Sequence, residues 1–113
     1  MKIEEFERVA RIDEITPTRP KRVMAGGLEI VLFRAGNEIF AIENLCPHQH
    51  FSVFHQGVLD GYILTCPMHA WSFDIRSGKA VTGSGRLRTF ELRVVGNEVL
   101  IKNSVAEQRF LNF

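Results

Sequence analysis

The sequence lacks the features that mark a membrane protein or a nucleic-acid-binding protein. No stretch approaches the roughly 18 to 20 consecutive apolar residues that span a bilayer. The 14 Lys and Arg residues and 13 Asp and Glu residues leave a net charge of +1, which gives no electrostatic reason to expect a nucleic acid as partner. The first ten residues carry Glu4, Glu5 and Glu7 where a signal peptide would have an apolar stretch. We therefore expect a cytoplasmic protein.

Cysteine is scarce, but both cysteines lie in informative positions. The chain has two, in Cys46-Pro47-His48 and Cys66-Pro67-Met68-His69, and 17 residues separate His48 from Cys66. Thiolate and neutral imidazole bind soft and borderline transition metals, so the pattern predicts a four-ligand metal site. A structural zinc finger usually combines a pair of cysteines with a pair of histidines, whereas each pair here is mixed. Mixed pairs suit a binuclear centre with sulfur at one metal and nitrogen at the other.

This pattern resembles the signature of Rieske 2Fe-2S proteins. Other motif residues agree with small Rieske ferredoxins, and the likeness runs from about Val23 to Lys102: Pro47 and Pro67 after the cysteines, Gly57 at the end of the first loop, and Trp71-Ser72-Phe73-Asp74 leading into Ser77-Gly78. The resemblance implies one Rieske-type 2Fe-2S cluster, bound by Cys46, His48, Cys66 and His69. The cluster-binding part is expected at about residues 44–78.

The family resemblance also implies a function. The chain is similar to the ferredoxin components of ring-hydroxylating oxygenase systems, which carry single electrons from a flavin-dependent reductase to a terminal oxygenase. With four histidines and no second domain, the chain is not expected to be the oxygenase or an enzyme in its own right. Two alternatives stay open: a small subunit resembling that of assimilatory nitrite reductase, and a zinc-stabilised interaction module without redox activity.

The predicted fold is all-β. The length of 113 residues suits one domain, residues 1–113, and short apolar runs separated by glycine-containing turns predict an antiparallel sandwich or barrel. We expect about eight to ten strands, with both cluster-binding loops at one end. The predicted turns include Ser77-Gly78-Lys79 after the strand 71–74 and four between strands: Gly26-Gly27, Gly36-Asn37, Asp60-Gly61 as a type I′ hairpin turn, and Gly96-Asn97. Residues 1–15 fit either a helical turn or an edge strand, while residues 89–94 alternate as one strand.

The residues after the last ligand predict a low reduction potential. High-potential Rieske proteins have a serine and a tyrosine where this chain has Trp71 and Phe73, so the hydroxyl groups that would stabilise the reduced cluster are missing. We expect a potential of about −150 mV, near the low end of the Rieske range. The ring nitrogens of His48 and His69 that do not bind metal also predict a potential that falls above neutral pH.

Further residues near the ligands have more than one interpretation. His50 and His55 are interpreted as polar loop residues rather than as spare ligands or proton relays, because the ligand set is complete without them. Three aromatic residues are interpreted as shielding the cluster rather than as a docking rim: Phe51, Phe54 and Trp71. The third loop reads Gly83-Ser84-Gly85, without the proline that is usual in the family, so a looser or differently shaped enclosure is expected. For the tail, residues 106–113, docking on the sheet and self-association both stay open.

Overall fold

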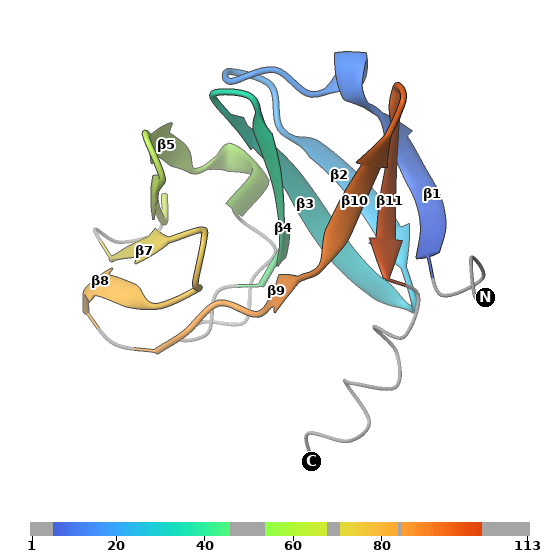
Figure 1. Ribbon diagram of the computed structural model, residues 1–113. Helices are drawn as coiled ribbons and strands as arrows, with labels where there is room; N and C mark the ends of the chain where they lie inside the picture. The colour runs from blue at the N-terminus through green and yellow to red at the C-terminus, as the bar shows by residue number, and fades with distance from the viewer. Residues whose placement is uncertain (1–5, 46–53, 68–70, 84, 103–113) are drawn as a thin grey trace.

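The structure is a computed structural model that describes residues 6–45, 54–67, 71–83 and 85–102. These residues form eleven β-strands and two short 3-10 turns (Figure 1). The elements are β1 (Phe6–Arg11), η2 (Ile12–Glu14), β2 (Lys21–Ala25), β3 (Leu28–Ala35), β4 (Glu38–Glu43), η3 (Phe54–Gln56), β5 (Val58–Asp60), β6 (Ile63–Thr65), β7 (Ser72–Asp74), β8 (Ala80–Thr82), β9 (Thr89–Phe90), β10 (Leu92–Val95) and β11 (Glu98–Lys102). The described residues contain no helix long and apolar enough to cross a membrane.

The strands form three antiparallel sheets. Their orders are β1-β11-β10, β2-β3-β4-β9 and β5-β6-β7-β8. In Figure 1 the first sheet lies to the right, the second lies in the middle and the third lies to the left. The expected antiparallel all-β class is therefore confirmed, with eleven strands in the described residues where eight to ten were predicted.

The central strand β3 explains why its sequence is a continuous apolar run. Ile30 and Leu32 point into one hydrophobic cluster, which also contains residues of β11. Val31 and Phe33 point into a second cluster, which contains residues of β6 and β7. Because successive side chains of a strand point to opposite faces, a strand with apolar cover on both faces needs apolar residues at every position.

Three of the four predicted two-residue turns are confirmed, and the fourth is shifted by one residue. The turns at Gly26-Gly27, Gly36-Asn37 and Gly96-Asn97 each join two paired strands. In the β5–β6 hairpin, however, Asp60 is the last strand residue and pairs with Ile63, so the two turn residues are Gly61 and Tyr62. Gly61 has a φ of 63° and supplies the left-handed conformation at the first turn position rather than the second.

Strand pairing decides the conformation of residues 6–11 and of residues 89–94. Residues 6–11 are an edge strand, because β1 pairs with β11. The single strand expected at residues 89–94 is wrong: β9 pairs with β4 in the middle sheet, while β10 pairs with β11 in the outer sheet. The chain changes sheet at Glu91, so an alternation that is continuous in sequence is divided between two sheets.

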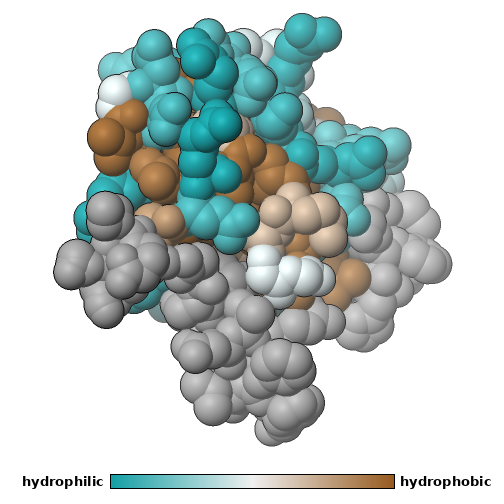
Figure 2. All heavy atoms as spheres, turned by 90° about the vertical axis from the view of Figure 1, so that its right-hand side faces the viewer, coloured by the Kyte–Doolittle hydropathy of each residue, from teal (hydrophilic) through white to brown (hydrophobic). Residues whose placement is uncertain are grey.

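The outer sheet carries part of the apolar surface. Figure 2 looks at the right-hand side of Figure 1 and shows apolar residues open to solvent between hydrophilic ones. In β10, Val94 and Val95 have exposed fractions of 41% and 59%. Surface valines of this kind are ordinary in a soluble fold and identify no ligand.

Candidate metal centre

One of the four predicted ligands lies within the described residues. Cys66 is described, whereas Cys46, His48 and His69 lie outside the described residues. The described segments contain no group of three or more potential metal-binding side chains. Within the described residues, the predicted centre is represented by Cys66 and by the residues that flank the two loops, which are residues 46–53 and 66–71.

Cys66 sits at the base of a short hairpin loop. The loop connects β6 to β7, and Thr65 pairs with Ser72 at its base, where the two hydroxyl oxygens are 3.0 Å apart. The backbone N–H of Cys66 donates to the carbonyl oxygen of Trp71 over 2.9 Å, which holds the two ends of the loop together. The Cys66 side chain is 2% exposed and belongs to the second hydrophobic cluster. A cysteine held in this way presents its sulfur in a fixed, water-poor position.

The end of the first loop packs against the stem of the second. Phe54 begins η3 and is completely buried, with its ring centroid 5.9 Å from that of Phe73 in an edge-to-face arrangement. Gly57 lies so close to β6 that a Cβ atom there would be 2.8 Å from the carbonyl oxygen of Thr65. The residues that follow the first loop therefore lie against the strands that flank the second loop, as a two-loop metal site requires.

The third loop approaches Trp71 more closely than any other residue type would allow. A Cβ atom added to Gly83 would lie 2.5–2.8 Å from three atoms of the Trp71 indole, and the φ of Gly83 is 81°. At this position glycine lets the backbone lie against the indole ring, while the looser or differently shaped enclosure of the cluster stays a prediction. Ser84 lies outside the described residues. The sequence indicated an unusual loop but gave no sign of its contact partner.

The structure decides between the interpretations of Phe54 and gives one contact of His55. Phe54 is part of the core and cannot belong to an exposed docking rim. The Nδ1 atom of His55 is 3.0 Å from the side-chain nitrogen of Asn44, so this ring nitrogen is occupied within the protein and unavailable to a metal. His50, Phe51 and the tail 106–113 lie outside the described residues.

The turn after β7 is held by an ion pair within the predicted motif. The Asp74 carboxylate accepts hydrogen bonds from the Arg76 side chain at 2.7 and 3.0 Å and from the Arg76 backbone N–H at 2.9 Å. The Arg76 guanidinium also lies over the Tyr62 ring, 4.2 Å from its centroid. The side-chain and backbone hydrogen bonds from Arg76 lower the pKa of Asp74 below its ordinary value.

We expect this carboxylate to contribute to stability at neutral pH. Because the folded-state pKa lies below the unfolded value of about 3.9, the contribution is present above that pH and is lost as the pH falls below it. Asp74→Asn should therefore lower the melting temperature at pH 7, and the difference from the wild-type protein should shrink as the pH falls below the unfolded value of about 3.9. Thermal melts from pH 7 to pH 3 measure this difference, with the exposed Asp60→Asn as control. A difference that grows in acid would contradict the assignment.

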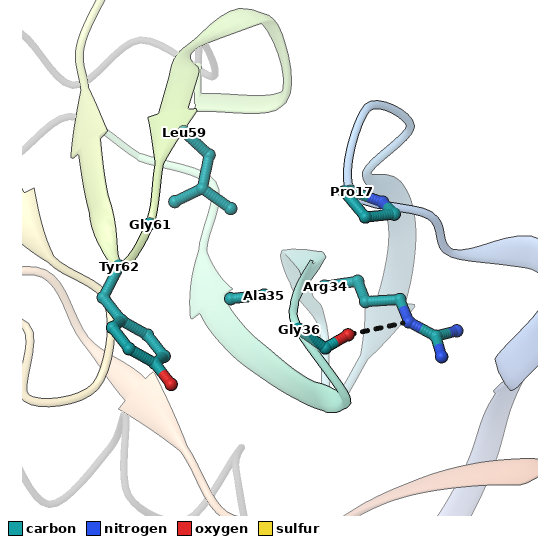
Figure 3. Close-up of a pocket in the computed structure, with 7 residues that line it drawn as sticks. All are labelled: Pro17, Arg34, Ala35, Gly36, Leu59, Gly61 and Tyr62. Atoms are coloured by element: carbon teal, nitrogen blue, oxygen red, sulfur yellow. Dashed lines mark hydrogen bonds between the residues drawn. The ribbon is translucent and has the colours of Figure 1, made fainter.

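A pocket of about 250 Å³ lies away from the loop stems (Figure 3). Its lining residues are Pro17, Arg34, Ala35, Gly36, Leu59, Gly61 and Tyr62. Gly61 and Tyr62 form the turn of the β5–β6 hairpin, at the opposite end of β6 from Cys66. The Arg34 side chain is engaged by the carbonyl oxygens of Gly36 and Ile15, each at 3.3 Å. No lining residue is a cysteine or histidine, so the pocket is separate from the metal centre.

Comparisons with known proteins agree with a two-loop iron–sulfur site. The chain is 35% identical over 97 residues to the ferredoxin subunit of anthranilate 1,2-dioxygenase from Burkholderia cepacia, covering 84% of this chain and 89% of that protein. The solved ferredoxin of carbazole 1,9a-dioxygenase from Nocardioides aromaticivorans IC177 has a TM-score of 0.76 and 30% identity, covering 85% of this chain and 95% of that chain.

A second solved structure extends the comparison to a complex. A chain in the complex of reduced oxygenase and oxidized ferredoxin in carbazole 1,9a-dioxygenase has a TM-score of 0.78 and 26% identity, covering 88% of this chain and 94% of that chain. The family model for the Rieske [2Fe-2S] domain matches residues 5–101. Three features agree with this match: cysteines and histidines in mixed pairs in the sequence, a buried Cys66 and an antiparallel β-fold. The chain belongs to the Rieske [2Fe-2S] domain family, and its cofactor is a Rieske-type 2Fe-2S cluster.

Proposed function

We propose that this protein is a one-electron carrier that takes electrons from a flavin-dependent reductase and passes them to a terminal oxygenase in the cytoplasm. In this proposal Cys46, His48, Cys66 and His69 hold the cluster. The observation that carries it is the buried Cys66 at the base of a hairpin loop, against which the end of the first loop packs. Similarity to a dioxygenase ferredoxin subunit over 84% of the chain supports the role in an oxygenase system.

The residues of the chain contribute position and environment to this function. When bound, the cluster supplies the one-electron oxidation and reduction. Cys66 is held by a backbone hydrogen bond to Trp71, and apolar side chains surround it, so its sulfur is protected from water. A ligand held on a paired strand end moves little when the charge of the site changes, and this favours rapid electron transfer. The proposal assigns no catalytic residue to this chain, because the chemistry on the substrate belongs to the oxygenase.

Spectroscopy of the purified protein tests the proposal. We expect anaerobically purified protein to be red-brown, to contain iron and acid-labile sulfide, and to give a rhombic EPR signal after dithionite reduction. Its reduction potential should be about −150 mV. A colourless protein with one zinc per chain would instead establish the zinc-stabilised module, and a potential well above zero would contradict the expected effect of Trp71 and Phe73.

Reconstitution distinguishes the oxygenase role from the nitrite reductase alternative. The reductase and oxygenase encoded near this gene should turn over an aromatic substrate only when the reduced carrier is added. An adjacent sirohaem reductase whose activity depends on this chain would support the alternative. Electron transfer to neither class of partner would contradict both roles.

A further inference from the structure

Asn44 is the one fully buried residue with a polar or charged side chain in the described part of the protein. It is 1% exposed, and it lies between the end of β4 and Cys46. Burying an amide side chain is unfavourable unless its donors and acceptors are satisfied. A buried asparagine two residues before a proposed metal ligand therefore requires a structural explanation.

Every hydrogen-bonding position of the Asn44 side chain is occupied. Its oxygen accepts the backbone N–H groups of Phe54, at 2.7 Å, and His55, at 3.3 Å. Its nitrogen lies 3.0 Å from Oε2 of Glu29 and 3.0 Å from Nδ1 of His55. Because an amide nitrogen can only donate, Nδ1 of His55 is an acceptor and its ring proton is on Nε2. Two donors and two acceptors thus have four partners.

The hydrogen bonds of Asn44 connect the two sides of the first loop. Asn44 precedes residues 46–53, whereas Phe54 and His55 follow them, so one side chain joins the two stems across ten residues of sequence. The same residue is anchored to β3, because its backbone N–H donates to the Glu29 carbonyl oxygen over 2.9 Å. The Glu29 carboxylate in turn contacts Arg22 of β2 at 3.3 Å. The stems are therefore tied to each other and to the middle sheet.

We propose that Asn44 is a positioning residue that joins both stems of the first loop to Glu29 on β3 and thereby sets how Cys46 and His48 are presented to the cluster. This inference rests on the proposed ligand set. The contacts require both donors and acceptors on one side chain. An amide meets this requirement, because its oxygen accepts from two backbone N–H groups while its nitrogen donates to a carboxylate and an imidazole. Removal of the side chain leaves the buried backbone N–H of Phe54 without its acceptor and frees the stems to separate.

The test uses the purified protein with its cluster and four variants. Asn44→Ala removes all four bonds, and Asn44→Asp keeps the acceptor but places a carboxylate against Glu29. The double variant Glu29→Gln with Asn44→Asp reverses the pair, because the new amide donates to the new carboxylate and His55 can donate from Nδ1 as its other tautomer. The matched control is Gln56→Ala, which removes an exposed amide next to His55. The readouts are the rate of iron loss to a chelator, the EPR g values of the reduced protein and its midpoint potential.

We expect Asn44→Ala to lose iron about tenfold faster than the wild type, with broadened or shifted g values and an altered potential. Gln56→Ala should stay within about twofold of the wild-type rate. Asn44→Asp should resemble Asn44→Ala, and the double variant should recover a large part of both the rate and the g values. If Asn44→Ala accumulates no cluster, recovery in the double variant relative to Asn44→Asp still decides the question.

Two results would overturn the positioning role. One is an Asn44→Ala protein with wild-type g values, potential and rate of iron loss. The other is a double variant no better than Asn44→Asp, because restoring the amide–carboxylate pair at positions 29 and 44 would then not restore what Asn44 supplies. A wild-type protein without iron and labile sulfide would be recognised separately, because it contradicts the proposed function before any variant is compared.

Discussion

Cys66→Ala is expected to abolish cluster binding. Cys66 supplies one of only two sulfur atoms available as cysteine ligands, and its side chain is buried at the base of the second loop. Alanine preserves the small apolar character of this buried site, so the loss should be chemical rather than a consequence of unfolding. We expect iron and acid-labile sulfide to fall to background and the visible absorption to disappear, while the far-ultraviolet circular dichroism shows that the β-fold is retained.

The matched control for this prediction is His50→Ala. His50 lies in the same segment as Cys46 and His48 but is not part of the proposed ligand set. His50→Ala should keep its full content of iron and sulfide and an unchanged EPR spectrum. A Cys66→Ala protein that retains the wild-type spectrum, or a His50→Ala protein that loses its iron, would show that the ligand assignment is wrong.

Gly78→Ala should cause the largest loss of stability among the glycine substitutions in the turns. Gly78 has a φ of 82°, and a Cβ atom there would overlap the carbonyl oxygen of Leu87. The same backbone is held on both sides, because Gly78 donates to Asp74 over 2.7 Å and accepts from Leu87 over 2.8 Å. Because Gly78→Ala adds both backbone strain and a steric overlap, we expect the free energy of unfolding to fall by about 3 kcal/mol. The melting temperature should be lower by roughly 10 °C or more.

Gly61→Ala separates the two contributions. Gly61 has a φ of 63°, but nothing lies within 4 Å of the Cβ position, so only the conformational cost of about 1 kcal/mol applies. The melting temperatures of the two variants should differ from each other by more than Gly61→Ala differs from the wild-type protein. Equal losses would mean that the backbone near Leu87 relaxes and that the close approach at Gly78 contributes nothing.

Turn positions were largely predictable, since the conformations of two-residue turns are set by the turn residues themselves. Gly26-Gly27 and Gly96-Asn97 join strands as expected, because a positive φ is available to glycine without steric cost. The hairpin at residues 60–62 was misplaced by one residue. Gly61 can serve at either position of a type I′ turn, so the turn chemistry alone could not choose the register. Pairing of Asp60 with Ile63 decided it.

Contacts between distant residues were beyond the reach of local patterns. Alternation in residues 89–94 wrongly predicts one strand, because the division into β9 and β10 depends on which neighbouring strand each half meets. The close approach of Gly83 to Trp71 likewise joins residues that no spacing rule connects. His55 was reasonably interpreted as a polar loop residue, yet its partner Asn44 carries no sequence signal beyond being polar after an apolar strand.

The sequence by itself determined the chemical type of this protein. Two cysteines and two histidines in mixed pairs specify sulfur and nitrogen donor atoms. The type of donor atom selects the kind of metal centre, whatever fold surrounds it. Only the tertiary structure decided that Cys66 is buried, that the end of the first loop packs on the stem of the second, and that Asn44 joins the stems to β3. The physical reason is that ligand preference and turn conformation are properties of single residues, whereas burial and hydrogen-bond partners depend on which distant segments the folded chain brings together.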